Sequence, residues 1–295
     1  MYEKFYGLTE KPFNLTPNSK YFYASPKHEE ALNCLLLAIS ERNGFVVITG
    51  DIGSGKTIVC RTLLNRLDST TKVALILNTH LNKKELLTAV LDDLGIEYES
   101  NSKTRLLSAL NKYLLDQAEK DINVVLIIDE AQNLTPSVLE EVRMLSNLET
   151  ETQKLIQIIL LGQPELKNKL AIPQLEQFRQ RIVFHYHLEP LNREETEEYV
   201  KHRLSKAGND ASDIFSTEAI DEIYRYSKGV PRLINVICHN ALINGLVKER
   251  KPITGGMIYD AVRFLIQWVN MPMKSPEEQN TPVVNMDDVI KKLMN

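Results

Sequence analysis

The sequence predicts an α/β fold, in which helices cover a parallel β-sheet, followed by a small all-helical domain. Residues 45–188 alternate short apolar segments with amphipathic helical patterns, as successive βαβ units do. A glycine-rich segment at residues 50–57 joins the first apolar segment to a helical pattern, and no strand-like segment follows Pro190. We therefore expect a sheet domain over residues 1–190 and a helical lid domain over residues 191–269.

Short apolar segments mark the expected strands, and one of them has the continuous apolar character of a strand buried on both faces. The strands are expected at residues 45–49, 73–77, 124–128, 156–161 and 183–187. The helical patterns between them include residues 58–67, 85–94 and 137–148. The lid helices are expected at residues 194–207, 218–227, 233–247 and 257–268, with Gly229 ending the second of them.

The end of the chain has a different composition. Residues 270–282 are polar and contain prolines, and residues 286–294 have a short amphipathic pattern. We expect residues 270–295 to form a flexible linker with a terminal segment that is either a docking helix or a frayed tail.

The glycine-rich segment has the full spacing of a P-loop, the phosphate-binding turn between a strand and a helix. Its residues are Gly50, Asp51, Ile52, Gly53, Ser54, Gly55, Lys56 and Thr57, and Ile58 follows in the helix. Glycines let consecutive backbone N–H groups point at one anion, and the helix dipole favours negative charge there. Lys56 is expected to reach the β- and γ-phosphates of ATP, and the Thr57 hydroxyl to bind Mg²⁺. The alternative is a structural turn, and the order of strand, loop, Lys-Thr and helix argues against it.

Two acidic residues follow the apolar segment at residues 124–128. Asp129, at the carboxyl end of this strand, is placed to hold Mg²⁺ through water, and Glu130 to polarise the attacking water as a general base. An Asp-Glu pair after a strand also occurs as a helix cap or a turn. In combination with the P-loop, the pair predicts an Mg-dependent ATPase.

Arginines near the end of the sheet domain and in the lid are candidates for contacts with the γ-phosphate. Arg232 begins a lid helix after Gly229 and Pro231, and these two residues fix a turn that would direct it inward. Arg179 and Arg181 precede the last strand, where one of them could reach a neighbouring subunit's ATP site as an arginine finger. Arg181 is the first choice and Arg179 the second. Exposed or salt-bridged surface arginines are the alternative in each case.

The composition excludes several other classes of protein. The chain has 295 residues and is 43% hydrophobic, which is enough for a sizeable core, yet no apolar stretch is long enough to cross a bilayer. An acidic residue and aromatics at the start do not fit a secretory signal. We therefore expect a cytoplasmic protein without an integral membrane segment. The net charge of −4 restricts nucleic-acid binding to a local patch.

The cysteines and two histidines give weaker signals. Cys34, Cys60 and Cys238 lie in apolar helical patterns without metal-like spacing, so we expect buried free thiols. His185 and His187 alternate on one strand and could form a metal pair, but no third ligand is near them in the sequence.

Several motifs, in order along the chain, resemble the AAA+ ATPases of the general secretion pathway protein A type. Besides the P-loop and the Asp129-Glu130 pair, they are Phe5-Tyr6-Gly7-Leu8, Lys11-Pro12-Phe13, Ala131-Gln132-Asn133-Leu134, Leu145-Ser146-Asn147-Leu148-Glu149, Leu161-Gly162-Gln163-Pro164-Glu165-Leu166, Gln180-Arg181-Ile182 and Gly229-Val230-Pro231-Arg232. The resemblance spans about residues 1–268. It implies a AAA+ core, with Lys56 and Thr57 in the Walker A motif and Asp129 and Glu130 in the Walker B motif.

The resemblance also implies roles for three further residues. Gln163 takes the sensor 1 position, where Asn, Ser or Thr is common, and its long polar side chain could still orient the lytic water. Arg232 takes the sensor 2 position. Asn78, at the end of the second strand, would hold Glu130 in an inactive pose.

The leading hypothesis for function is an enzyme whose ATP state controls a partner protein complex. ATP would bind between subunits and order a homo-oligomer, and hydrolysis would reset it. Larger secretion members of the family carry a membrane span and a peptidoglycan-binding region after the ATPase, and neither is expected here. The chain therefore resembles a short soluble branch, linked to pilus, exopolysaccharide or protein-sorting systems, cytoplasmic or peripheral at the inner membrane through a partner.

Two further hypotheses belong to other classes of protein. AAA+ regulators of DNA transposition share the core and bind duplex DNA, so an ATP-switched DNA-binding scaffold is the second hypothesis. Its candidate contacts are Lys83, Lys84, Lys248, Arg250, Lys251 and Arg263. The alternative is that these residues are ordinary solvated lysines and arginines of the surface. A nucleotide-binding structural protein without catalysis is the third.

Overall fold

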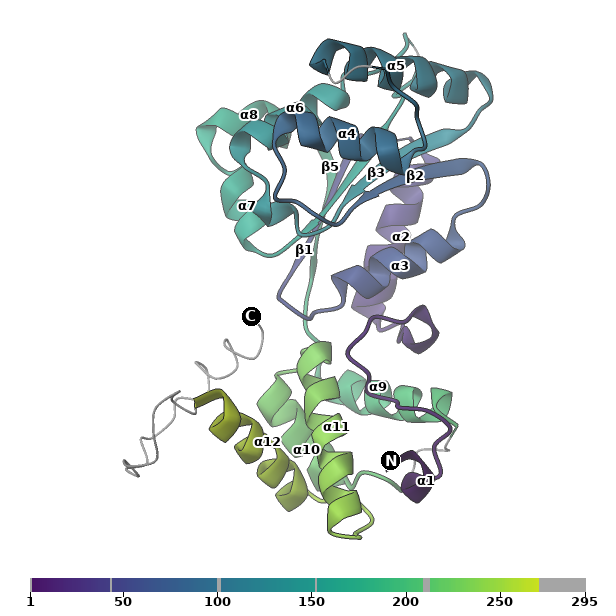
Figure 1. Cartoon of the computed structure of the whole chain (residues 1–295). Helices are drawn as coiled ribbons and strands as arrows, with labels where there is room; N and C mark the ends of the chain where they lie inside the picture. Colours follow the sequence, from purple (N-terminus) through teal and green to yellow (C-terminus); the bar gives the residue numbers. More distant parts are fainter. Residues whose placement is uncertain (1, 43, 100–101, 152, 209–212, 271–295) are drawn as a thin grey trace. The chain divides into compact units, whose positions relative to one another are not determined.

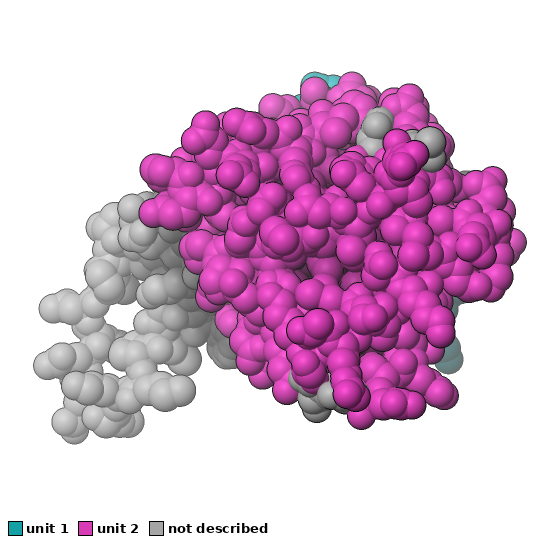
Figure 2. Space-filling view, turned by 90° about the horizontal axis from the view of Figure 1, so that it is seen from above, with its two compact units in different colours: residues 1–25, 52–55, 190–295 teal, residues 26–51, 56–189 magenta. Residues whose placement is uncertain are grey.

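The computed structural model describes residues 2–42, 44–99, 102–151, 153–208 and 213–270. The chain divides into two compact units, coloured separately in Figure 2. The sheet unit comprises Pro26–Asp51 and Lys56–Glu189. The helical unit comprises Met1–Ser25, Ile52–Gly55 and Pro190–Asn295.

The sheet unit contains a five-stranded parallel sheet, which confirms the predicted fold class. Its strands are β1 (Phe45–Gly50), β2 (Thr71–Ile76), β3 (Asn123–Ile128), β4 (Gln157–Gly162) and β5 (Ile182–Leu188), in the spatial order β2-β3-β4-β1-β5. Every residue of β1, β3 and β4 is buried, because these strands lie inside the sheet with helices on both faces. β2 and β5 form the edges, and their burial is partial.

Helices cover both faces of this sheet (Figure 1). They are α2 (Pro26–Ser40), α3 (Lys56–Arg66), α4 (Lys83–Asp93), α5 (Lys103–Glu119), α6 (Pro136–Leu145), α7 (Glu165–Leu170) and α8 (Glu176–Arg179), with 3₁₀ turns η2 (Ala131–Asn133) and η3 (Pro173–Leu175). Alternate residues of β3, beginning with Val124, pack in one core with the apolar residues of α4, α5 and α6. α2 and α3 lie on the opposite face.

The helical unit consists of α1 (Tyr2–Tyr6), a 3₁₀ turn η1 (Ser19–Tyr21), α9 (Arg193–Lys206), α10 (Thr217–Ser227), α11 (Pro231–Val247) and α12 (Gly255–Asn270). The last four agree with the predicted lid helices. α10 is followed by Lys228 and Gly229, both of which have a positive φ. A Cβ on Gly229 would lie 1.7 Å from the carbonyl oxygen of Leu191, so only glycine fits this turn.

The N-terminal segment packs differently from our expectation, which grouped it with the sheet. Tyr2, Tyr6 and Phe13 are buried among the apolar residues of α9 to α12. Arg203 of α9, itself buried, donates from Nε to the carbonyl oxygen of Pro12 at 2.6 Å. Aromatic residues scattered through a short segment carry no periodicity that indicates which unit will bury them. The segment therefore belongs with the helical unit.

The predicted linker and terminal amphipathic segment lie outside the described residues, apart from residue 270 at the end of α12. Within the described ranges, no helix combines the length and the apolar character that a bilayer crossing requires.

Candidate functional site

The P-loop follows β1 and leads into α3, in the order that the sequence predicts. Gly53 and Gly55 have φ values of 77° and 107°, a conformation that strongly favours glycine. Lys56 begins α3 and is only 6% exposed, with Nζ donating to the carbonyl oxygens of Gly50 at 2.7 Å and Asp51 at 2.9 Å. Burial lowers the pKa of the Lys56 ammonium from its ordinary value, while nearby carboxylates oppose the shift. The loop thus encloses a cation where phosphate oxygens are expected.

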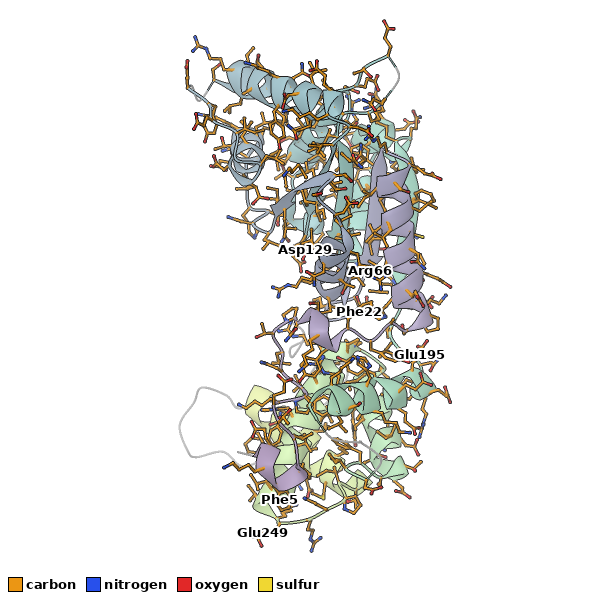
Figure 3. The ribbon with its side chains drawn as sticks, turned by 90° about the vertical axis from the view of Figure 1, so that its right-hand side faces the viewer. Phe5, Phe22, Arg66, Asp129, Glu195 and Glu249 are labelled. Carbon is orange, nitrogen blue, oxygen red and sulfur yellow. The ribbon has the colours of Figure 1, made fainter. Side chains whose placement is uncertain are left out.

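The hydroxyl of Thr57 lies directly beside the carboxylate that ends β3. Thr57 Oγ1 donates to Asp129 Oδ2 at 3.0 Å, and Asp129 is 5% exposed at the end of its strand (Figure 3). Burial raises the pKa of the Asp129 carboxyl, and the hydrogen bonds from the Glu130 backbone N–H and the Thr57 hydroxyl partly counteract it. Two hard oxygen ligands side by side fit Mg²⁺, which keeps several waters and takes further oxygens from bound phosphates. Thr57 and Asp129 are therefore the residues that would hold the ion.

Among the described residues, no three His, Cys, Asp or Glu side chains lie close enough together to form a metal site. His185 Nε2 and His187 Nδ1 both lie near Thr49 Oγ1, at 3.2 and 3.0 Å. Cys60 and Cys238 are buried free thiols, and burial raises the pKa of Cys60 to about 12. Cys34 is only partly buried, contrary to our expectation, because its position on α2 is not on the fully buried face.

The backbone of Glu130 has a conformation that is uncommon for a residue with a side chain. Its φ of 53° and ψ of 38° fall in the left-handed region. Two neighbours hold this geometry, since the Glu130 N–H donates to Asp129 Oδ1 at 2.9 Å and Thr79 Oγ1 donates to the Glu130 carbonyl oxygen at 3.2 Å. Thr79 is 3% exposed and follows β2. Such backbone strain persists where surrounding contacts impose it, and it often accompanies a functional site.

The carboxylate of Glu130 accepts hydrogen bonds from two glutamine side chains. Gln132 Nε2 lies 2.6 Å and Gln163 Nε2 lies 3.3 Å from Glu130 Oε2. The structure therefore brings Gln163, the sensor 1 candidate, to the predicted general base. Gln132 belongs to one of the sequence motifs, yet its position in the sequence indicates no role, because two-residue spacing after a strand does not reveal where a side chain points.

The role expected of Asn78 is wrong for this conformation. Asn78 is exposed, and its Oδ1 accepts from the backbone N–H of His80 at 3.2 Å. It turns back on its own loop, as Asn side chains commonly do. Its neighbour Thr79 and the later Gln132 make the contacts to Glu130 instead.

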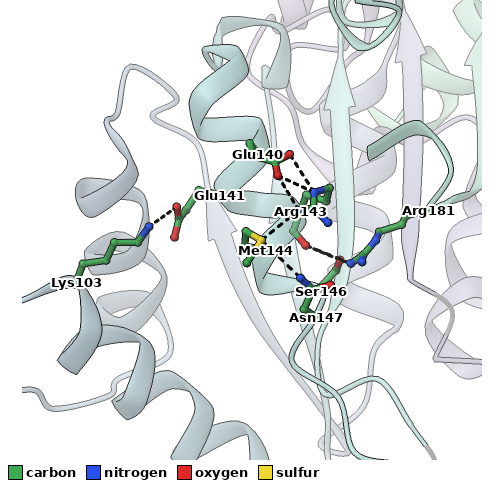
Figure 4. Close-up of polar contacts among 8 residues, drawn as sticks. All are labelled: Lys103, Glu140, Glu141, Arg143, Met144, Ser146, Asn147 and Arg181. Atoms are coloured by element: carbon green, nitrogen blue, oxygen red, sulfur yellow. Dashed lines mark hydrogen bonds and ion pairs between the residues drawn. The ribbon is translucent and has the colours of Figure 1, made fainter. Parts of the chain in front are cut away.

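The two arginines before β5 are partly buried and already bonded within the sheet unit. Arg181 donates to Ser146 Oγ at 2.6 Å and to the carbonyl oxygen of Arg143 at 3.4 Å, just beyond α6 (Figure 4). Arg179 donates to the carbonyl oxygens of Leu170, at the end of α7, and of Ile172, before η3, at 2.8 and 3.0 Å. Each arginine therefore has two hydrogen-bond acceptors within its own unit, a hydroxyl and a carbonyl oxygen for Arg181 and two carbonyl oxygens for Arg179.

Arg232 is exposed near the start of α11, directly after Pro231. Within the helical unit, its backbone N–H donates to the carbonyl oxygen of Gly53 at 3.3 Å. A Cβ on Gly53 would lie 2.5 Å from the Cβ of Arg232, so this approach requires a glycine.

The basic candidates for DNA contacts fall into two groups. Lys248 pairs with Asp260 at 2.7 Å, and Lys251 is bonded to the carbonyl oxygen of Phe5. Lys83 and Lys84, together with Lys103, line an open cavity of about 610 Å³ between the end of β2 and the start of α6. Lys103 also has a partner, Glu141 at 2.6 Å (Figure 4), so of the three lysines at this cavity it is ion-paired within the sheet unit.

Comparison with known proteins identifies the class of protein to which this fold and this P-loop belong. A family model described as an AAA domain matches residues 39–170, which contain the P-loop, Asp129 and Glu130. Among solved structures, the Cdc6p protein of Pyrobaculum aerophilum has a TM-score of 0.65 at 18% identity, covering 86% of this chain and 74% of that one. The Holliday junction branch migration motor RuvB of Thermotoga maritima has a TM-score of 0.55 at 18% identity, covering 82% of this chain and 70% of that one. At such identities the likeness concerns the fold alone. The chain belongs to the AAA+ family of P-loop ATPases.

One relative is much closer in sequence. General secretion pathway protein A of Aeromonas hydrophila is 42% identical over 259 residues, which is 88% of this chain. The resemblance seen in the motifs is thereby confirmed. The chain spans about half of that relative's length, 47%.

Proposed function

We propose that the chain binds ATP with Mg²⁺ and hydrolyses it. The observation that carries this proposal is the contact of Thr57 with Asp129 beside the buried Lys56 of the P-loop. These groups come from two segments, and each matches the oxygen and phosphate chemistry of an Mg–nucleotide.

Each residue of this site has a distinct part in the proposed reaction. The P-loop N–H groups and Lys56 bind the phosphates and stabilise the charge that moves onto them during transfer. Thr57 and Asp129 would hold Mg²⁺, and the ion would supply positive charge against the phosphates. Glu130 accepts a proton from the attacking water at its carboxylate, and Gln163 donates to the same carboxylate.

The cellular role that we propose is the assembly or regulation of a partner protein complex by an ATP-dependent homo-oligomer. The sequence relative is named for a general secretion pathway, and this supports a complex of that kind. In the oligomer, Arg181 would act in a neighbouring subunit's site, with Arg179 as the second choice, and Arg232 would act as sensor 2 within its own subunit. The protein would work in the cytoplasm, or peripherally at the inner membrane through its partner.

The direct test is Glu130→Gln, which keeps the shape of the side chain and removes the base. We expect hydrolysis to fall about 10²- to 10⁴-fold with ATP binding retained, because the loop and the Mg²⁺ ligands are unchanged. The control is Glu119→Gln at an exposed position of α5, which should behave as wild type. A fully active Glu130→Gln protein would refute the base assignment.

The action of Arg181 between subunits has its own test. Arg181→Ala and Lys56→Ala proteins should each be inactive alone, and their mixture should recover activity because one subunit supplies the arginine and the other an intact site. If the mixture stays inactive, Arg181 acts within its own chain through Ser146.

A second candidate function is ATP-dependent binding of duplex DNA, and Lys83 and Lys84, which lie together beside the open cavity, favour it. Retention on duplex DNA should then require ATP and fall steeply with salt. Lys83→Ala combined with Lys84→Ala should weaken it, whereas Lys112→Ala, at an exposed position of α5, should not. Equal retention of all these proteins would exclude this surface.

A further inference from the structure

The carboxylate of Glu130 is held by a side chain that bridges two strand ends. Gln132, in the η2 turn after β3, donates from Nε2 to Glu130 Oε2 at 2.6 Å. Its Oε1 accepts the backbone N–H of Gln163 at 3.0 Å, directly after β4. One amide group thus links the residue that follows β3 to the residue that follows β4.

The orientation of this amide is fixed by its partners. A backbone N–H can only donate, so the group facing Gln163 N must be the Gln132 oxygen. The nitrogen then faces Glu130, whose ionised carboxylate can only accept. Both hydrogen bonds are satisfied in one orientation, and the flipped amide would lose both.

The surroundings of Gln132 restrict its movement further. A Cβ on Gly162 would lie 3.1 Å from Gln132 Oε1, so the end of β4 leaves room for this amide. Lys169 Nζ donates to the carbonyl oxygens of Gln132 and of Leu134, the latter at 2.7 Å. The main chain and the side chain of Gln132 are therefore both tied to the segment that follows β4.

We propose that Gln132 is a positioning residue, which sets the direction of the Glu130 carboxylate for proton transfer from water. The proposal rests on the proposed ATPase function. A carboxylate has about four lone-pair sites, so the two glutamine contacts leave Glu130 able to accept from a water. Because Gln132 ties Glu130 to Gln163, a displacement of the β4 end is transmitted to the base. A misplacement of about 1 Å in such a group costs on the order of 10²-fold in rate.

The test compares three variants of the full chain with the wild type. ATP hydrolysis by the wild type is measured first, because a wild type without activity would refute the proposed ATPase function rather than the role of Gln132. Gln132→Leu removes both hydrogen bonds and keeps most of the volume. Gln132→Glu keeps an acceptor for the Gln163 N–H and places a carboxylate against Glu130. Gln174→Leu makes the same Gln-to-Leu change at an exposed position of η3 and should behave as wild type.

Both Gln132 variants should lower kcat by about 10²-fold while the KM and the Kd for ATP stay within about twofold of the wild type. In the Glu130→Gln background, Gln132→Leu should lower the residual rate no further, since its effect passes through the Glu130 carboxylate. A purely structural role would instead predict weaker ATP binding and an equal loss of rate in both backgrounds. Weaker ATP binding, an equal loss in both backgrounds, or a wild-type kcat in either Gln132 variant overturns the proposal.

Discussion

Replacing Arg203 by leucine should release the N-terminal segment from the helical unit. This guanidinium is 7% exposed and bonds to Pro12 O at 2.6 Å, Asn14 O at 3.3 Å and Tyr199 Oη at 2.9 Å. It also lies over the ring of Tyr21, 4.7 Å from the centroid. The residue therefore connects α9 to three points of a segment that has little regular structure of its own.

The expected loss of stability follows from the contacts that each partner of Arg203 would lose. The buried carbonyl of Pro12 loses its donor, at a cost of about 1–3 kcal/mol. The desolvated cation–π contact with Tyr21 adds about 1 kcal/mol. Tyr199 keeps its hydrogen bond to Asn235 at 3.0 Å and adds little. The total is about 3 kcal/mol, or about 10 °C in melting temperature for a unit of this size.

Thermal denaturation and limited proteolysis would measure this effect. Arg203→Leu should melt earlier and expose residues 1–25 to cleavage while the sheet unit stays resistant. Arg225→Leu is the matched control, because that side chain is 67% exposed and its contacts, with Glu222 and the ring of Tyr226, lie on its own helix. If both variants melt within about 2 °C of the wild type, Arg203 does not anchor the segment.

Three other predictions concern the lid turn, the histidines and the metal. Gly229→Ala should destabilise the protein by more than about 2 kcal/mol, because the new Cβ meets a backbone oxygen at a positive φ. Gly256→Ala, with open space around it, should be neutral or slightly stabilising. Equal melting temperatures of the two variants would contradict the predicted clash at Gly229. Burial lowers the pKa of His202 and His239, so the native state resists their protonation and the free energy of unfolding should fall as pH decreases through about 6.5. Denaturant titrations at two pH values should show a smaller fall for His239→Gln, and an unchanged fall would refute the assignment. Chelation of Mg²⁺ should abolish hydrolysis reversibly, and Thr57→Ala should raise the Mg²⁺ concentration needed for half-maximal rate; activity that survives chelation would exclude a metal role for Thr57.

The agreement between sequence and structure is best where the signal is local. The strands, the P-loop and the lid helices follow from apolar periodicity and from glycine and proline positions, which act within a few residues. The same holds for Asp129, since a residue directly after a buried parallel strand must lie at the carboxyl edge of the sheet. Of the helices in the sheet unit, α2 is indicated only by the helical pattern around Cys34, and α5 is not named from the sequence although it contains apolar residues at helical spacing.

The sequence by itself determined the fold class, because apolar periodicity and turn residues act locally. It also predicts the residues that would bind phosphate and Mg²⁺, since that chemistry is carried by two short stretches of chain. Only the tertiary structure decided that residues 1–25 pack with the helical unit, and that Gln132 and Thr79 rather than Asn78 contact Glu130. The contacts to Glu130 depend on the register of the strands and on the left-handed backbone of Glu130 itself. Such a conformation is imposed by neighbours that are distant in sequence, so no local pattern encodes it.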